Sequence, residues 1–261
     1  MGNDSSKHGG QVDRKKLPLS LRSGPSSSTM RRHLENATKS RILQLKACGL
    51  KAFPEQIETV KDVIRTLDLS ENKIKELPLS IGEFSNLKQL HLASNRLSSL
   101  PDEIGLLKAL EVFNAASNLL TDLPLSFAGL RSLKTLNLSD NKFIKLPVVI
   151  CHLPSLDTLH LANNFIEELP DEIKDLKASE VNLNQNRLST LNPNLARCEK
   201  LRTLRVEENC LSRTAFTSEL LSDSPVSLIS YAGNLFQDKD FQNLPGYDKY
   251  QTRFTATKRK M

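Results

Sequence analysis

The chain has 261 residues, with 36 Lys and Arg against 30 Asp and Glu and a formal net charge of +6 at pH 7. Aromatic residues are 5% of the chain, Trp is absent, and Gly and Pro are too few for a low-complexity sequence. This composition predicts a folded protein with a leucine-dominated core, and no stretch approaches the roughly 18 consecutive apolar residues of a membrane-spanning helix.

Residues 1–28 are polar and basic, and we expect them to form a flexible tail. The first 41 residues hold nine Lys and Arg and three acidic residues, an excess equal to the whole net charge of +6. The opening MGNDSSK matches the N-myristoylation pattern M-G-x-x-x-[ST], with Gly2 as the acceptor and Ser6 at the required position. An unmodified tail with solvated charges is the alternative interpretation.

A lipid anchor at Gly2 would need a second signal, and the tail contains one. A single myristoyl chain binds membranes reversibly, with an association constant of about 10⁴ M⁻¹. Each Lys or Arg near an anionic leaflet adds about 1 kcal/mol. The basic run DRKK at 13–16 and Arg22 therefore favour stable attachment to an anionic membrane surface.

The tail has no apolar segment of the kind found in secretory signals, which predicts a cytoplasmic protein held at a membrane by its lipid anchor and basic tail. In that reducing compartment the cysteines are expected to be free thiols. They share no CxxC spacing and are not grouped with His, so we predict no metal site. The four cysteines are Cys48, Cys151, Cys198 and Cys210.

Residues 29–41 are predicted to form a short helix that caps the repeated segment that follows. Ser28 or Thr29 is a suitable N-cap residue, and Met30, Leu34 and Ala37 recur at helical spacing.

A pattern of the form L-x-x-L-x-L-x-x-N-x-L recurs between residues 42 and 240, at spacings of 22 to 25 residues. Cys48 fills the asparagine position of the first copy. A fixed period of this size indicates a solenoid of about nine coils. The asparagines are Asn72, Asn95, Asn118, Asn141, Asn164, Asn186, Asn209 and Asn234.

Each copy predicts a short strand, a tight bend and a return limb. Alternating residues such as Leu90 and Leu92 would point into the core. The bend would leave backbone groups that water cannot reach, and each unmade hydrogen bond would cost about 1–3 kcal/mol. An amide has both a donor and an acceptor, so the asparagines are predicted to form a structural ladder between coils.

Five consecutive copies continue with Leu-Pro, and one reads LPDEIGLLKAL. Residues 40 to about 240 therefore resemble the 23-residue class of intracellular leucine-rich repeat proteins. The resemblance implies an α/β solenoid, a curved horseshoe with a parallel sheet on its concave face and helical caps. The ends, RRHLENATKSR and GYDKYQTRFTATKRK, resemble one subfamily of that class, in which N-myristoylation is implied. Residues 7–29 depart from it as an insertion.

Residues 241–261 predict a C-terminal cap followed by a basic tail, TKRK at 257–260. A solenoid needs its last coil covered, and five large residues within fourteen positions suit a closing helix. These residues are Phe241, Leu244, Tyr247, Tyr250 and Phe254.

Two outward rows of strand residues line the predicted concave face, and stacked at about 4.8 Å per strand they span roughly 38 Å. That length suits a protein or peptide better than a small metabolite. One row reads Gln44, Asp68, His91, Asn114, Asn137, His160, Asn182, Arg205 and Ser230. Its neighbour reads Lys46, Ser70, Ala93, Ala116, Ser139, Ala162, Asn184, Glu207 and Ala232. We predict that Asp68, His91, Asn114, Asn137, His160, Asn182 and Arg205 bind the partner.

Catalysis is not predicted. His91 and His160 lie three coils apart, roughly 14 Å on strand spacing, and cannot form a pair. Asp68 and His91 lie on adjacent coils within hydrogen-bonding reach, with Ser70 or Ser94 nearby. A Ser-His-Asp triad also needs an oxyanion hole and a closed pocket, which an open sheet does not supply. No glycine-rich phosphate loop is present, so we expect no cofactor.

We therefore predict a monomeric adaptor or scaffold that binds a protein partner on its concave face. One alternative is a regulatory subunit of a small-GTPase or phosphatase signalling complex, by analogy with related repeat families. The other is an RNA-associated repeat protein, which is disfavoured because no aromatic residues interleave with the basic ones as a stacking surface needs.

Overall fold

The structure, a computed structural model, describes residues 24–258. The expected lipidation site Gly2, the basic residues of the tail up to Arg22 and the last basic residues at 259–260 lie outside the described residues.

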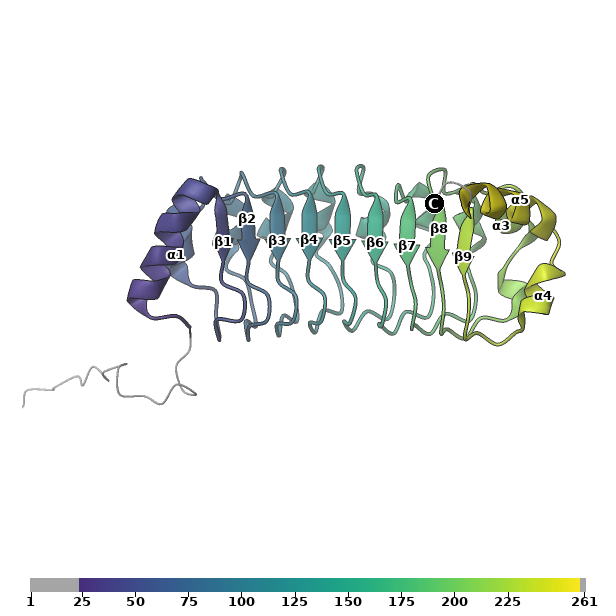
Figure 1. Ribbon diagram of the computed structural model, residues 1–261, viewed down its shortest axis with the longest axis horizontal. Helices are drawn as coiled ribbons and strands as arrows, with labels where there is room; N and C mark the ends of the chain where they lie inside the picture. The colour runs from purple at the N-terminus through teal and green to yellow at the C-terminus, as the bar shows by residue number, and fades with distance from the viewer. Residues whose placement is uncertain (1–23, 259–261) are drawn as a thin grey trace, which may run out of the picture.

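Nine short parallel strands form one open sheet in which strand order equals chain order (Figure 1). The register is the same at every step, so equivalent residues of successive repeats lie side by side, as Leu67 does beside Leu90. The strands are β1 (Ile42–Gln44), β2 (Thr66–Asp68), β3 (Gln89–His91), β4 (Val112–Asn114), β5 (Thr135–Asn137), β6 (Thr158–His160), β7 (Glu180–Asn182), β8 (Thr203–Arg205) and β9 (Leu228–Ser230). This is the leucine-rich repeat solenoid that the repeat predicts.

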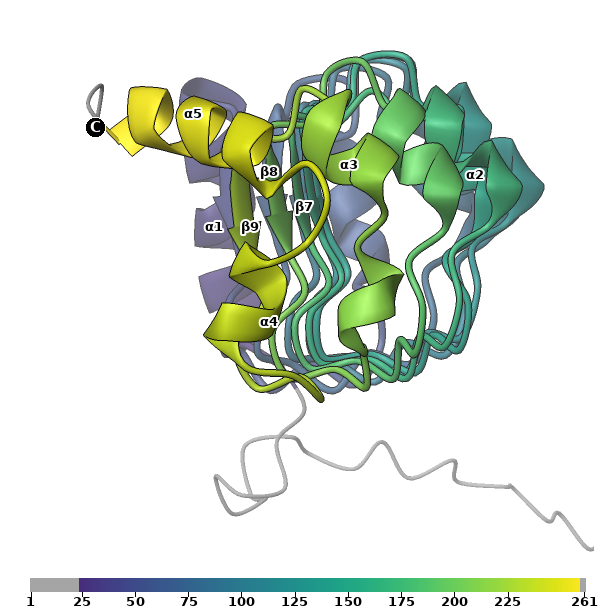
Figure 2. The same cartoon turned by 90° about the vertical axis from the view of Figure 1, so that its right-hand side faces the viewer.

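The return limbs run along the opposite side and contain short helices (Figure 2). Five begin directly after the proline of a Leu-Pro pair, because the proline ring holds φ near −65° and needs no N–H at the helix start. The 3-10 helices are η3 (Glu55–Val60), η4 (Leu79–Glu83), η5 (Asp102–Leu106), η6 (Leu125–Gly129), η7 (Asp171–Asp175), η8 (Pro193–Arg197) and η9 (Arg213–Ala215). The α-helices on this side are α2 (Val148–Cys151) and α3 (Ser218–Ser222).

The core lies between the sheet and the return limbs. The two inward-facing strand side chains of each repeat, mostly leucines, point into it, and Leu90 and Leu92 are both fully buried. Cys151 and Cys198 also lie in the core, where burial raises the pKa of each thiol to about 12 and keeps it protonated at pH 7. All four cysteines are free.

A buried asparagine joins each coil to the one before it. Asn141 Nδ2 donates to Leu138 O and Ser139 O of its own coil at 3.0 and 3.1 Å, and to Ala115 O of the preceding coil at 3.0 Å. Its Oδ1 accepts from Leu120 N of the preceding coil at 3.0 Å. Equivalent contacts are made by Asn72, Asn95, Asn118, Asn164, Asn186 and Asn209.

The residue before each ladder position has a left-handed backbone conformation, which the repeat pattern does not reveal. Its φ lies between 53° and 76° in all nine repeats, although only the last is glycine. This single left-handed residue turns the chain from the strand into the bend. The nine are Ala47, Glu71, Ser94, Ser117, Asp140, Asn163, Gln185, Glu208 and Gly233.

Helix α1 (Ser27–Ser40) packs on β1 and covers the first coil. It begins two residues before the predicted start, because Ser26 is the N-cap and its hydroxyl accepts from Thr29 N at 3.2 Å. Met30 and Ala37 are buried, and Leu34 packs against the core. The helix ends at a left-handed Arg41.

Two helices, α4 (Asp238–Gln242) and α5 (Tyr247–Lys258), close the other end, where the sequence predicts one. Tyr250 Oη accepts from Ile229 N at 3.0 Å. This bond gives a partner to a backbone N–H of the last strand, β9. The Arg253 guanidinium donates to the carbonyls of Leu221, Ser222 and Val226. The cap therefore pairs the Ile229 N–H that a following strand would have bonded, and Arg253 ties α5 to the last coil.

Candidate functional site

The sheet forms the face that the sequence predicts to bind a partner, and the core does not use the three outward residues that each coil places there. The predicted binding residues all stand at the last position of β2 to β8, and the parallel register places them in a single row. Each is partly exposed. The structure therefore brings together Asp68, His91, Asn114, Asn137, His160, Asn182 and Arg205 as neighbours along one line.

Four side chains of this row are held by their own backbone. The Oδ1 atoms of Asn114 and Asn137 accept from the backbone N–H two residues later at 3.1 and 3.0 Å. Asp68 and Asn182 make the same contact at 2.9 and 3.0 Å. This contact fixes one oxygen of each side chain. In the three asparagines it also orients the Nδ2 group, whose two N–H donors are not used by this bond and can reach a partner.

The possible hydrogen bond between Asp68 and His91 does not occur among the described contacts. The two residues are register neighbours in β2 and β3, but Asp68 Oδ1 accepts from Ser70 N instead. His91 is thus left as a partly exposed side chain on an open sheet. No group of three or more potential metal ligands exists within residues 24–258.

A third outward row, formed by the first residue of each strand, was missed by the sequence reasoning. The alternation of strand side chains contains the signal, since residues two positions before the predicted row face the same way. The row matters because Arg205 pairs with one of its members: Arg205 Nε lies 3.2 Å from Glu180 Oε1. The row is Ile42, Thr66, Gln89, Val112, Thr135, Thr158, Glu180, Thr203 and Leu228.

Glu207 and Glu208, near the C-terminal end of the face, are not ion-pair partners of Arg205 among the described contacts. Glu207 accepts from Asn184 Nδ2 at 2.6 Å, and its own N–H donates to Asn184 Oδ1 at 2.9 Å. Glu208 accepts from Gln185 Nε2 at 2.9 Å. These amide partners hold both carboxylates in place without neutralising them.

One carboxylate at the margin of the sheet forms ion pairs with two lysines. Glu111 lies between Lys88 and Lys134 of the adjacent coils, with Nζ to carboxylate distances of 2.7 and 2.8 Å. Hydrogen bonds from Lys134 and Lys88 hold the pKa of Glu111 at about 2. The triplet ties three successive coils together on their solvent side.

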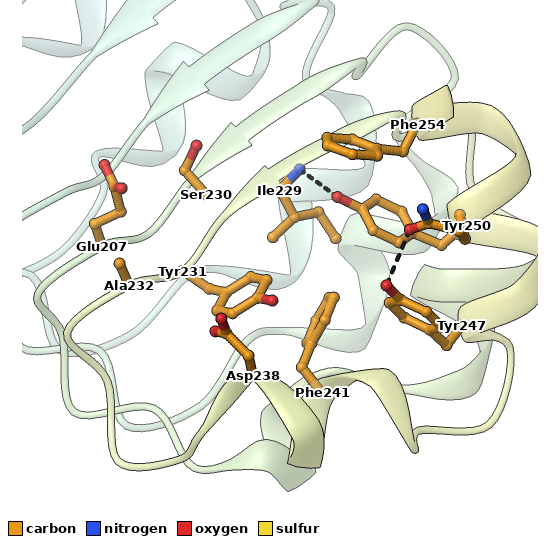
Figure 3. A pocket seen from close by; sticks show the side chains of 11 residues that line it. Glu207, Ile229, Ser230, Tyr231, Ala232, Asp238, Phe241, Tyr247, Tyr250 and Phe254 are labelled. Atoms are coloured by element: carbon orange, nitrogen blue, oxygen red, sulfur yellow. Dashed lines mark hydrogen bonds between the residues drawn. The ribbon is translucent and has the colours of Figure 1, made fainter. Parts of the chain in front are cut away.

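A pocket of about 290 Å³ opens where the sheet face meets the C-terminal cap (Figure 3). Its walls come from β9, from the loop after it and from helices α4 and α5. Helix α5 projects beyond β9 on the sheet side and forms a raised wall at this end (Figure 2). The sequence assigned the aromatic residues here to the cap alone, because periodicity cannot show where side chains of separate elements leave a space between them.

Comparisons with known proteins agree with this architecture. A leucine-rich repeat region model matches residues 19–118, and a second leucine-rich repeat model matches residues 112–166. Within residues 24–258 no helix has the length and apolar character required to cross a bilayer.

Solved structures with the same fold include a leucine-rich repeat protein of Leptospira interrogans, 29% identical with a TM-score of 0.67 over 82% of this chain and 62% of that one. A TDR receptor is 26% identical, with a TM-score of 0.67 over 85% of this chain and 40% of the receptor. The plant peptide hormone receptor RGFR1, solved in complex with RGF2, is 26% identical, with a TM-score of 0.61 over 78% and 34%.

This chain thus spans less than two thirds of the length of the proteins that it matches. The two family models cover consecutive stretches of the same solenoid, and the repeat, the nine-stranded parallel sheet and the asparagine contacts extend the pattern to residue 234. On these grounds the chain belongs to the leucine-rich repeat family.

Proposed function

We propose that this protein is an interaction module that binds a protein partner across its sheet face. The observation that carries the proposal is the single register row of partly exposed polar side chains over seven successive strands. Because the core and the ladder use none of these side chains, their alignment offers an extended segment many small contacts at fixed spacing. The fold shared with the receptor solved in complex with RGF2 supports a peptide or protein ligand.

The proposal places the main contacts in the middle of the face, at Asn114 and Asn137, because their amide donors are oriented and the neighbouring outward residues are small. The next outward-facing residue after Asn114 is Ala116, and after Asn137 it is Ser139, so a partner backbone can approach closely. The charged pair of Arg205 and Glu180 lies farther along the face and would set orientation rather than affinity.

Binding is tested by partner capture with the full chain expressed in cells. The double variant Asn114→Arg, Asn137→Arg places two bulky charges in the middle of the face and is expected to reduce captured partners at least about tenfold, the effect of 1.4 kcal/mol. The matched control, Leu79→Arg with Leu125→Arg, changes two exposed residues of the return limbs. Loss of partners in the control alone would move the interface to the opposite side and overturn the proposal.

The second part of the proposal is a lipid tether at Gly2, working with the basic residues that follow it. It rests on the sequence motif and on the resemblance of both chain ends to leucine-rich repeat-containing protein 57. A tethered monomer would hold its sheet face near a membrane and act there as a scaffold.

The tether is tested by intact-mass measurement of protein from eukaryotic cells and by sedimentation with anionic liposomes. The wild type is expected to carry one myristoyl group and to sediment, whereas Gly2→Ala carries none and stays in solution. Equal mass and equal partition of the two forms would rule the tether out. RNA at matched salt serves as the competing ligand, and preference for RNA over liposomes would favour the RNA-associated alternative.

A further inference from the structure

The pocket at the C-terminal end of the sheet face combines aromatic walls with acidic side chains. Its cavity of about 290 Å³ is of the size that accommodates one side chain rather than a drug-sized molecule. Rings reach it from the loop after β9, from α4 and from α5 (Figure 3). The aromatic residues that line it are Tyr231, Phe241, Tyr247, Tyr250 and Phe254.

These rings are held in place by one another and by hydrogen bonds. Tyr231 and Phe241 are inclined at 32° with centroids 4.2 Å apart, and Tyr247 meets Phe241 edge to face at 5.8 Å. Tyr250 is anchored through Ile229 N. Tyr247 Oη lies 2.9 Å from Gln251 Oε1. The aromatic wall therefore exists before a ligand arrives, which lowers the ordering cost of binding.

Two carboxylates complete the lining. Glu207 stands on the sheet side and is held by Asn184, and Asp238 stands at the start of α4. Within residues 24–258, neither lies within 4.0 Å of a basic side chain. The face of an aromatic ring attracts a cation, and a carboxylate does so more strongly at short range.

The two arginines nearest the pocket are engaged elsewhere. Arg205 pairs with Glu180, and Arg253 donates to carbonyls of the last coil. Lys258 Nζ lies 4.8 Å from the centroid of Phe254, so one ring of this cluster already attracts an ammonium group from within the chain. The residues that line the pocket therefore include two carboxylates and no basic side chain.

We propose that this pocket binds an alkylammonium side chain, that of lysine or N-methylated lysine, presented by the partner that lies along the sheet face. This inference rests on the proposed function and adds the chemistry of one anchoring residue. A neutral apolar side chain would cover Glu207 and Asp238 without compensating their lost hydration. An ammonium group gains from both the carboxylates and the rings, and N-methylation strengthens the ring contribution because it weakens the hydration of the cation.

The first experiment needs no partner and uses the full chain with small probes. N-acetyl lysine methylamide, its trimethyl derivative and the uncharged tert-butyl isostere of that derivative are titrated while the aromatic resonances are followed by NMR. Both cations are expected to shift the resonances of Tyr231, Tyr247 and Phe254, with the neutral isostere at least about tenfold weaker. Equal binding of the isostere would identify a plain hydrophobic pocket, and absence of shifts with either cation would overturn the proposal.

The second experiment removes the charges without altering shape. Glu207→Gln and Asp238→Asn are each expected to weaken binding of the trimethyl probe at least about threefold. The matched control is Glu208→Gln, which removes one negative charge from a residue adjacent to Glu207 that does not line the cavity. An equal effect of the control would mean that overall charge, rather than the pocket, attracts the probe.

The outcomes separate this inference from the proposed function. If the Asn114→Arg, Asn137→Arg variant loses its partner while the probes fail to bind, the sheet face binds but the pocket does not supply an anchor. If the probes bind and partner capture is unaffected by the sheet-face variant, the pocket binds an ammonium group but the sheet face is not the interface. Melting temperatures of all variants within about 2 °C of the wild type would show that each change acts on binding rather than on folding.

Discussion

A buried amide at each bend is the residue-scale device on which the solenoid depends. Each ladder asparagine between Asn72 and Asn209 bonds its own coil and the preceding one, so a single side chain pairs backbone groups of two repeats. Serine or alanine would leave some of these groups unpaired in a dry interior. The penalty for an unpaired buried group, about 1–3 kcal/mol, explains why the amide recurs.

Asn141→Ala is expected to lower the free energy of unfolding by about 1–3 kcal/mol, because it leaves Leu120 N of the preceding coil without a partner and removes one of the two amide donors to Ala115 O. Asn234→Ala should cost less, since Asn234 is partly exposed and donates to fewer carbonyls. Urea unfolding of the two variants measures the difference. Equal losses would contradict a ladder whose strength depends on burial.

Gly105 allows two neighbouring coils to pack closely because it has no side chain. A Cβ atom there would lie 2.1 Å from Ser126 O of the next coil, an approach that only a shift of the backbone can relieve. Gly105→Ala is expected to cost about 1–3 kcal/mol, as overpacking does. The control is Ala128→Gly at the equivalent position of the next coil, for which we expect about 0.5–1 kcal/mol. Thermal melts compare them, and a harmless Gly105→Ala would show that the coils can separate at little cost.

At the scale of the element, the caps replace missing neighbours by specific hydrogen bonds. Tyr250→Phe keeps the ring and removes the oxygen that pairs Ile229 N, so it is expected to destabilise by about 1–3 kcal/mol. Hydrogen exchange at Ile229 should accelerate with it. Tyr247→Phe is the control, because its partly exposed hydroxyl contacts only a side chain in α5. If both variants behaved alike, the hydroxyl of Tyr250 would not be closing the sheet.

The Lys88–Glu111–Lys134 triplet predicts a pH dependence of known sign. The folded-state pKa of Glu111, about 2, lies below its ordinary 4.5, so its stabilising contribution is present above pH 4.5 and is lost as pH falls towards 2. Glu111→Gln should therefore lower the urea midpoint at pH 7 and have little effect near pH 2. Glu76→Gln, an exposed site, should have little effect at either pH. A pH-independent difference for Glu111→Gln would exclude the ion pairs as its cause.

At the scale of the whole molecule, stability passes only between neighbouring coils, because each strand pairs only with its neighbours in sequence. Deleting residues 237–261, which removes α4 and α5, is expected to expose the last coil to solvent. Amides of β8 and β9 should lose protection from hydrogen exchange at least about tenfold, while those of β2 to β5 keep it. Uniform loss along the array would contradict nearest-neighbour coupling.

Much of the architecture could be predicted because it is local and repeated. The leucine phase predicts which face of each strand is buried, and the recurring asparagine marks each bend. The left-handed residue before the asparagine could not be predicted, since Glu71, Ser94 and Asp140 share no side-chain chemistry that favours it. Closure of the bend imposes that conformation on whichever residue occupies the position.

The sequence by itself determined the period, the burial of the leucines and the row of polar residues on the sheet face, because these follow from side-chain alternation within one copy. Only the tertiary structure decided that Arg205 pairs with Glu180, that Asp68 turns to Ser70 N rather than His91, and that the aromatic cap encloses a pocket beside Glu207. Those outcomes depend on the distances between side chains of different coils and helices, and the spacing of residues along one chain does not contain them.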